Sequence, residues 1–159
     1  MKVIVLLLSQ FLFASTLSAQ DLEFNKYPSN SKQLTELKKL QINAANNKYI
    51  TLLTKLSKQP INFAGHYVLE SFGCGGGCQA LAVYNAKTGQ AFIHPQNFSD
   101  CYSQSHGFVG RDYEFHKNSR LLVVTGSRST QQGHCEKVYY LVRENHFEEI
   151  SQSWIYKKD

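Results

Sequence analysis

Apolar residues recur at two different periods along the chain. In the first third the spacing is three to four residues, which is typical of helices. From Ser31 to Ala44 the leucines follow this spacing: Leu34, Leu37 and Leu40. A shorter apolar stripe runs from Ile50 to Leu56 and ends before Pro60. The pattern predicts a helical segment at the N-terminus of the domain.

After Pro60 the sequence changes to short, mostly apolar runs separated by turn residues, a pattern typical of strands. We expect strands at 66–72, 79–85, 90–94, 113–116, 120–125, 137–143 and 147–150. Residues 86–89 are an expected hairpin turn, because Gly89 can adopt a positive φ. Two longer connections remain, at 95–111 and 126–136. The fold class that follows is α+β, with the N-terminal helical segment packed on an antiparallel β-meander of about six or seven strands.

The first 19 residues are organised like a secretory signal peptide. Lys2 precedes a short apolar core, and small residues follow it up to Ala19. This core is shorter than the roughly 20 residues that a membrane-spanning helix needs. We expect cleavage after Ala19 and a periplasmic or secreted location. The mature chain, residues 20–159, is then a single disulfide-stapled domain without a membrane span.

Charge along the chain is mild and scattered. The formal net charge is +5 at pH 7, and 18% of the residues are charged. The only adjacent basic pairs are Lys38-Lys39 and Lys157-Lys158. A nucleic-acid-binding surface usually concentrates its basic residues on one face. We therefore expect no nucleic-acid partner, whereas attraction to anionic envelope polymers stays open.

The mature chain holds four cysteines: Cys74, Cys78, Cys101 and Cys135. An even number in an exported protein favours two disulfides. Three pairings are possible, and we favour Cys74–Cys78 with Cys101–Cys135. The glycines between the first two let a small ring close, and the other two lie in the long connections.

Other chemistry at the cysteines stays open. Structural zinc sites usually contain two closely spaced ligand pairs, whereas only Cys74 and Cys78 are close in sequence. A neighbouring histidine, His134 or His94, could replace a thiolate. Cys74 is also a candidate nucleophile, although no known nucleophile motif surrounds it. We expect no cofactor and no resident metal.

Six histidines suggest a hydrolase as another alternative: His66, His94, His106, His116, His134 and His146. Two converging histidines could cleave a phosphodiester by acid–base catalysis. No spacing in the sequence indicates that any two converge, so we assign no catalytic residue.

Two segments are typical of binding sites. The polar stretch 126–134 joins two expected strands, and rigidly anchored loops often carry recognition residues. Arg128 and His134 are its candidate binding residues. The second segment is 62–67, which enters the first expected strand. Its candidates are His66 and Tyr67.

Three segments form a recognisable pattern: 62–67 (Asn-Phe-Ala-Gly-His-Tyr), 73–78 (Gly-Cys-Gly-x-x-Cys) and 86–89 (Ala-Lys-Thr-Gly). Over residues 60–150 the chain resembles a group of small exported bacterial proteins. The resemblance implies an envelope location and transfers neither an activity nor a catalytic residue. Size, export and paired cysteines are also similar to those of periplasmic lysozyme inhibitors, although the chain lacks a Ser-Gly-x-x-Tyr inhibitory motif.

The sequence favours an exported binding module without catalytic activity, such as an inhibitor or immunity-type protein that occludes an envelope-active enzyme. Its partner is then an envelope protein or a glycan. The alternatives are a small exported hydrolase that uses a histidine or Cys74, and a metal- or thiol-dependent protein.

Overall fold

A computed structural model describes residues 23–30, 34, 36–103, 105, 107–128 and 134–157. The predicted signal peptide, residues 1–19, lies outside the described residues. So do His106 and most of the loop that precedes His134.

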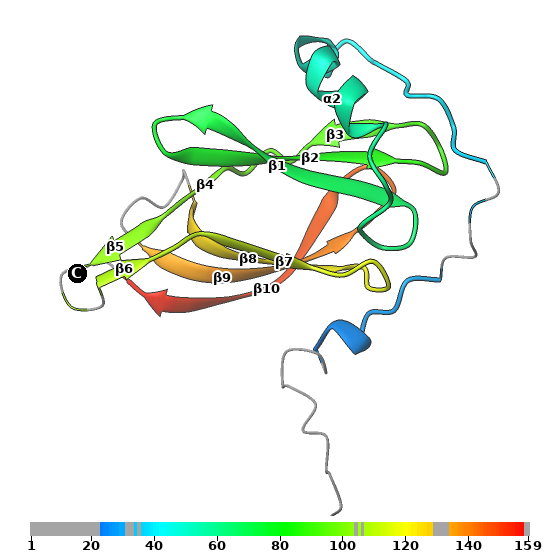
Figure 1. Cartoon of the computed structure of the whole chain (residues 1–159). Helices are drawn as coiled ribbons and strands as arrows, with labels where there is room; N and C mark the ends of the chain where they lie inside the picture. Colours follow the sequence, from blue (N-terminus) through cyan, green and yellow to red (C-terminus); the bar gives the residue numbers. More distant parts are fainter. Residues whose placement is uncertain are drawn as a thin grey trace, which may run out of the picture.

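Short strands dominate the described chain (Figure 1). The helical elements of the described chain are a turn at residues 23–25, η1 (Asn47–Tyr49) and α2 (Ile50–Leu56). The first strands are β1 (Tyr67–Gly75), β2 (Cys78–Asn85), β3 (Ala91–Ile93), β4 (Phe98–Ser99), β5 (Cys101–Ser103) and β6 (Gly107–Val109). The remaining strands are β7 (Asp112–Phe115), β8 (Leu121–Arg128), β9 (Cys135–Val142) and β10 (Phe147–Tyr156).

Eight of these strands belong to one antiparallel sheet, and β5 and β6 pair separately as a hairpin. The main path is β1-β2-β4-β8-β9-β10, with β3 on β2 and β7 on β8. The two-residue strand β4 joins the two halves, since Phe98 pairs with both Gln79 and Arg128. The sheet bends there, so that β1–β3 lie over β7–β10 as two layers (Figure 1).

The main core lies between these layers. In β1, Tyr67 and Leu69 point into it, and in β2 Leu81 and Val83 do so. From the other layer come Leu122 and Val124 of β8, Val138, Tyr140 and Val142 of β9, and Phe147 of β10. The alternation of inward and outward residues follows from the two-residue period of a strand.

Helix α2 covers the outer face of β1 and β2. Leu53 and Leu56 are fully buried there against Val68, Ala82 and Tyr84. Because both faces of β1 are covered at its start, Tyr67, Val68 and Leu69 are all buried.

The predicted fold class is wrong. The protein is mostly an antiparallel β-structure with one short helix, not an N-terminal helical segment on a meander. The expected helix from Ser31 to Ala44 is absent in its described part, where residues 37–40 have no regular structure. Residues 31–33 and 35 lie outside the described part.

Backbone pairing with the sheet explains this difference. Lys38 N–H donates to Ala86 O at 2.9 Å, and Gln41 N–H donates to Gly89 O at 2.8 Å. A Cβ on Gly89 would lie 2.2 Å from Lys39 O, so only glycine allows this close approach. The chain therefore runs extended along the β2–β3 turn, and Leu37 is 53% exposed.

The strands also extend beyond the predicted ranges. Strands β4, β5 and β6 lie inside the predicted connection 95–111. Strand β8 continues to Arg128, and β10 continues to Tyr156 with register shifts on the way. The polar residues of these extensions conceal the alternation that identifies a strand.

Candidate functional site

Both predicted disulfide pairs are present. Cys74–Cys78 closes the turn between β1 and β2, and Cys101–Cys135 joins β5 to β9. Cys101 and Cys135 are buried, and with Tyr156 they form a small apolar cluster. The second disulfide therefore anchors the start of the β5–β6 hairpin to the main sheet.

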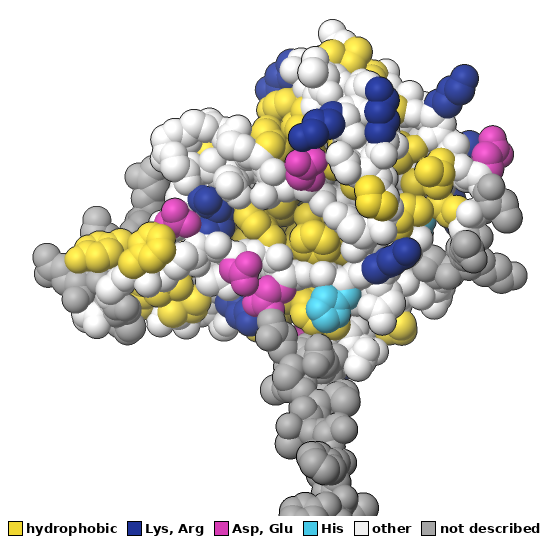
Figure 2. Space-filling view, viewed as in Figure 1, with side chains coloured by type: hydrophobic (Ala, Val, Ile, Leu, Met, Phe, Trp, Pro, Cys, Tyr) yellow, Lys and Arg dark blue, Asp and Glu magenta, His cyan; other side chains and the backbone are white. Residues whose placement is uncertain are grey.

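The β5–β6 hairpin carries two large exposed aromatic side chains. Tyr102 is 67% exposed and Phe108 is 69% exposed, more than the other exposed large hydrophobic residues in the described chain. These two residues are directly opposite each other in the hairpin register. Figure 2 shows apolar side chains on the projecting end at the left of the molecule, where Figure 1 shows β5 and β6.

Arg111 fixes the base of this hairpin. Its backbone N–H donates to Asp100 Oδ1 at 2.9 Å, and its Nη1 lies 3.7 Å from the same oxygen. The same Nη1 donates to Gly77 O at 2.8 Å. Gly77 lies inside the Cys74–Cys78 ring, so Arg111 connects both disulfide-bonded regions.

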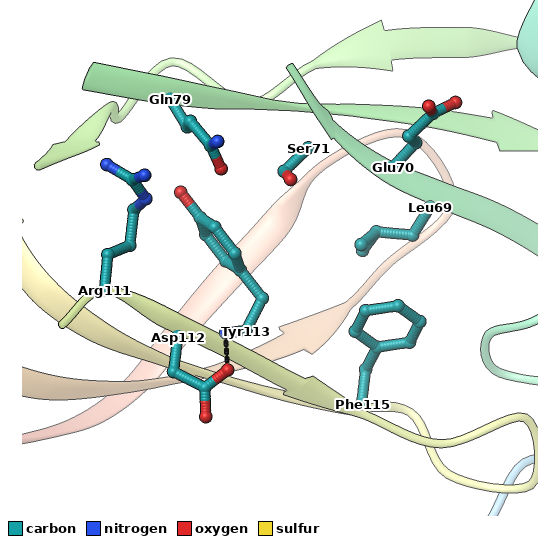
Figure 3. A pocket seen from close by; sticks show the side chains of 8 residues that line it. All are labelled: Leu69, Glu70, Ser71, Gln79, Arg111, Asp112, Tyr113 and Phe115. Carbon is teal, nitrogen blue, oxygen red and sulfur yellow. Dashed lines mark hydrogen bonds between the residues drawn. The ribbon is translucent and has the colours of Figure 1, made fainter. Parts of the chain in front are cut away.

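A cleft of about 480 Å³ continues from Arg111 between the two layers. Its lining side chains come from β1, β2, β7 and the residue before β7 (Figure 3). Figure 3 shows the Tyr113 hydroxyl pointing toward Ser71 and Gln79, with Arg111 beside it. Leu69 and Phe115 face each other farther along the cleft.

One buried polar group of the cleft is available for contacts. The Tyr113 hydroxyl is buried and has no hydrogen-bond partner among the described residues. Burial raises the pKa of Tyr113 to about 12, so the hydroxyl stays protonated and can donate. Among the strands of the described residues, β1 pairs with β2 alone and β7 pairs with β8 alone. Asn62 and Phe63 bond to the other edge of β1 at Tyr67 and Leu69, so this edge is open only beyond Leu69. An extended segment can add there or at the open edge of β7.

Arg128, a predicted binding residue, lies at the end of β8 with its guanidinium buried. Nε and Nη2 donate to the two oxygens of Glu136 at 2.6 and 2.7 Å. Nη1 donates to Glu149 at 2.7 Å, and Nη2 also donates to Gln152. Hydrogen bonds to these carboxylates raise the pKa of Arg128. These protein groups occupy the donors that a ligand would need.

His134, the second residue predicted in that loop, directly precedes β9. Its ring is half-buried, and its centroid lies 5.3 Å from that of Trp154 in β10. Arg128 and His134 therefore lie on either side of a loop that is outside the described residues.

His66 and Tyr67 line a separate cavity of about 290 Å³, whose charged lining residues are Lys87, Arg120, Arg143 and Glu144. The Tyr67 hydroxyl donates to Arg143 O at 3.3 Å, and burial raises its pKa to about 12. Burial and the Lys87 charge lower the pKa of His66. The structure thus brings these two predicted residues together at a basic cavity, and their binding role stays a prediction.

The other described histidines lie in separate places. His94 is 3% exposed and packs edge-on against Tyr140 and Phe147. His116 stacks on Phe24, and His146 contacts Asn145. Cys74 carries no free thiol, because it is bonded to Cys78.

The described residues contain no cluster of three or more metal-ligating side chains. Within the same residues, no helix has the length and apolarity to cross a membrane.

Tyr102 and Phe108 were not predicted from the sequence. They lie in the predicted connection 95–111, where each three-residue strand is too short to show alternation. One signal was available, since the two aromatic residues are equally distant from Ser105, as expected for a hairpin centred there.

Comparisons with known proteins add no assignment to this site. No protein-family model, no curated protein and no solved structure matches the chain. The resemblance to small exported bacterial proteins therefore stays a prediction.

Proposed function

We propose that this protein is a non-catalytic binding module of the bacterial envelope, periplasmic or secreted, that occludes an envelope-active enzyme. The observation that carries the proposal is the hairpin β5–β6, which presents Tyr102 and Phe108 as a solvent-exposed pair. This hairpin enters a concave site on the enzyme.

The shape and chemistry of the hairpin support this mode of binding. It projects from one end of the molecule, so its natural complement is a cleft (Figures 1 and 2). Tyrosine and phenylalanine have few rotatable bonds, and their large contact areas often dominate binding energy. The Cys101–Cys135 bond holds the hairpin base, which lowers the entropy lost on docking.

The cleft beside Arg111 extends the same surface. A segment of the partner can follow the free edge of β1 or β7, while the Tyr113 hydroxyl and the Gln79 amide offer polar contacts. Two disulfides support the envelope location, because such bonds persist in oxidising compartments.

The proposal is tested with the mature protein immobilised and exposed to an envelope extract of the bacterium that expresses it. The wild type should retain one enzyme and inhibit it after purification. The double variant Tyr102→Ala/Phe108→Ala should raise the Kd of that complex about a hundredfold, because two central aromatic anchors are lost.

The matched control is Leu37→Ala/Ile50→Ala, which removes two exposed hydrophobic side chains from another part of the surface. This control should bind like the wild type. If both double variants bind equally well while folding normally, the hairpin is not the docking element. A retained enzyme that stays fully active would contradict the occlusion.

A further inference from the structure

A further cavity, of about 370 Å³, is lined by uncharged residues. Its walls come from the run 41–46, from the start of β3 and from the turn before β10. Five carboxamide side chains line it: Gln41, Asn43, Asn46, Gln90 and Asn145. The lining residues include no charged side chain, whereas the cavity at His66 has Lys87, Arg120 and Arg143.

Three of the carboxamides are held in position by the protein. Gln41 Nε2 donates to Thr88 O at 3.2 Å. Asn43 Oδ1 accepts from Asn46 N–H at 3.0 Å, and Asn46 Nδ2 donates to Ala91 O. In each case one half of the amide is hydrogen-bonded to the protein. Gln41 and Asn43 are exposed, so their other halves can contact a ligand, whereas Asn46 is buried and fixes the wall of the cavity.

The backbone beneath them is also fixed. Gln41 forms a parallel bridge with Gln90, and its N–H donates to Gly89 O at 2.8 Å. The Gln90 carboxamide forms no hydrogen bond with another described residue. Carboxamide donors and acceptors therefore line a rim that is fixed at Gln41, Asn43 and Asn46.

Apolar surface lies between the amides. Ile42, Ala45 and Phe92 contribute it, and Phe92 is partly buried. A ligand that suits this lining has no net charge, several hydroxyl or amide groups, and small apolar faces. A volume of this size is at the lower end of ligand cavities, which span about 300–1,000 Å³.

We propose that this cavity binds an uncharged saccharide that carries acetamido groups. The acetamido N–H and C=O complement the free halves of the carboxamides, and its methyl group contacts the apolar patch. The site is distinct from the hairpin and does not depend on the proposed enzyme partner.

The test uses the mature protein and triacetylchitotriose, followed by NMR titration or calorimetry. Saturable binding should be seen for this trisaccharide, and binding of cellotriose, which lacks acetamido groups, should be at least tenfold weaker. The double variant Asn43→Ala/Gln90→Ala should weaken binding of triacetylchitotriose about tenfold, because two hydrogen-bonding side chains are lost.

The control variant is Asn118→Ala, which removes an exposed carboxamide from the turn between β7 and β8. It should bind the saccharide like the wild type. Equal affinity for both trisaccharides would overturn the acetamido assignment. Undiminished binding by the folded double variant, or no binding at millimolar concentration, would overturn the site. Capture of an enzyme by the hairpin is unaffected by either result, so the two proposals fail independently.

Discussion

The two ends of the layered sheet are held together by different chemistry. The hairpin end comprises the 74–78 turn, the β5–β6 hairpin and the ends of β8 and β9. It is closed by two disulfides and by the buried Arg128–Glu136 pair. The turn end comprises residues 64–66 and the turns 86–89, 117–120 and 143–146.

Hydrogen bonds to backbone carbonyls close the turn end. Gly65 N–H donates to Lys117 O at 2.6 Å, and Ala86 N–H donates to His66 O at 2.8 Å. Tyr67 and Asn85 reach across to the carbonyls of Arg143 and Glu144. Each such bond contributes about 1 kcal/mol to the free energy of unfolding, and several of them together hold the turn end.

The difference shows where single changes matter most. The hairpin end relies on a few strong links, and these links support the surface that we propose for docking. The turn end spreads its stability over many weak contacts. Substitutions at the hairpin end should therefore cost more stability than matched substitutions at the turn end.

The largest loss of stability is expected for Arg128→Ala. The variant leaves the fully buried Glu136 without its cation, and this should lower the free energy of unfolding by about 3–5 kcal/mol. The matched change at the turn end is Arg120→Ala, which removes a bond to Pro28 O and should cost under about 1 kcal/mol. Urea unfolding measures both, and similar losses would contradict the comparison.

Removal of the disulfides should cause the next largest losses of stability. Cys101→Ala/Cys135→Ala opens a loop of 34 residues and should cost about 3–4 kcal/mol, because the unfolded chain gains the most freedom. Cys74→Ala/Cys78→Ala opens a separation of only 4 residues and should cost about 2 kcal/mol. Denaturant midpoints under non-reducing conditions give the order; the reverse order would count against the hairpin anchor.

Acid should weaken the fold through His94. Burial, with a smaller effect of the Arg128 charge, lowers the pKa of His94 to about 4 in the folded protein, against 6.5 for an unburied histidine. Between pH 4 and pH 6.5, the unfolded chain therefore binds more protons than the folded protein does. The contribution of His94 to the free energy of unfolding is fully present above pH 6.5. It falls by about 3 kcal/mol as the pH decreases toward 4.

The variant His94→Phe isolates this contribution. It removes the titrating ring, so the free energy of unfolding should depend less steeply on pH from 6.5 to 4 than in the wild type. Thermal or urea unfolding at several pH values measures the slope. Parallel curves for the two proteins would exclude His94 as the cause.

The smallest losses of stability are expected for substitutions at two glycines with positive φ, one at each end of the sheet. At the turn end, Gly89→Ala should cost about 2 kcal/mol, since the backbone is strained and the new methyl group meets Lys39 O. At the hairpin end, Gly76→Ala meets nothing within 4 Å and should cost about 1 kcal/mol from backbone strain alone. Equal melting temperatures of the Gly89→Ala and Gly76→Ala variants would show that the turn 86–89 does not hold residues 37–41.

Local patterns in the sequence identified part of this structure. Short apolar runs bounded by turn residues predicted β1, β2 and β8, and in β2 and β8 these runs are buried on both faces. The cysteine pairing followed from spacing and from the positions of the long connections. Helix α2 was found because Leu53 and Leu56 share one buried face.

The features that were not predicted from the sequence depend on contacts between residues that are distant in the chain. Leucines at helical spacing in 34–40 do not form a helix, because the backbone of this run bonds to Ala86 and Gly89. Arg128 looked like an exposed anchor in a polar loop, but Glu136, Glu149 and Gln152 surround it from the next two strands. The carboxamide cavity was not predicted either, because its residues come from three segments.

The central claim is that the hairpin end binds the partner, and hydrogen–deuterium exchange on the purified complex tests it most directly. We expect protection of amides in 101–109 and 111–113 on binding, with little change in 86–89 and 117–120. Protection confined to the turn end, with the hairpin amides exchanging as in the free protein, would contradict it.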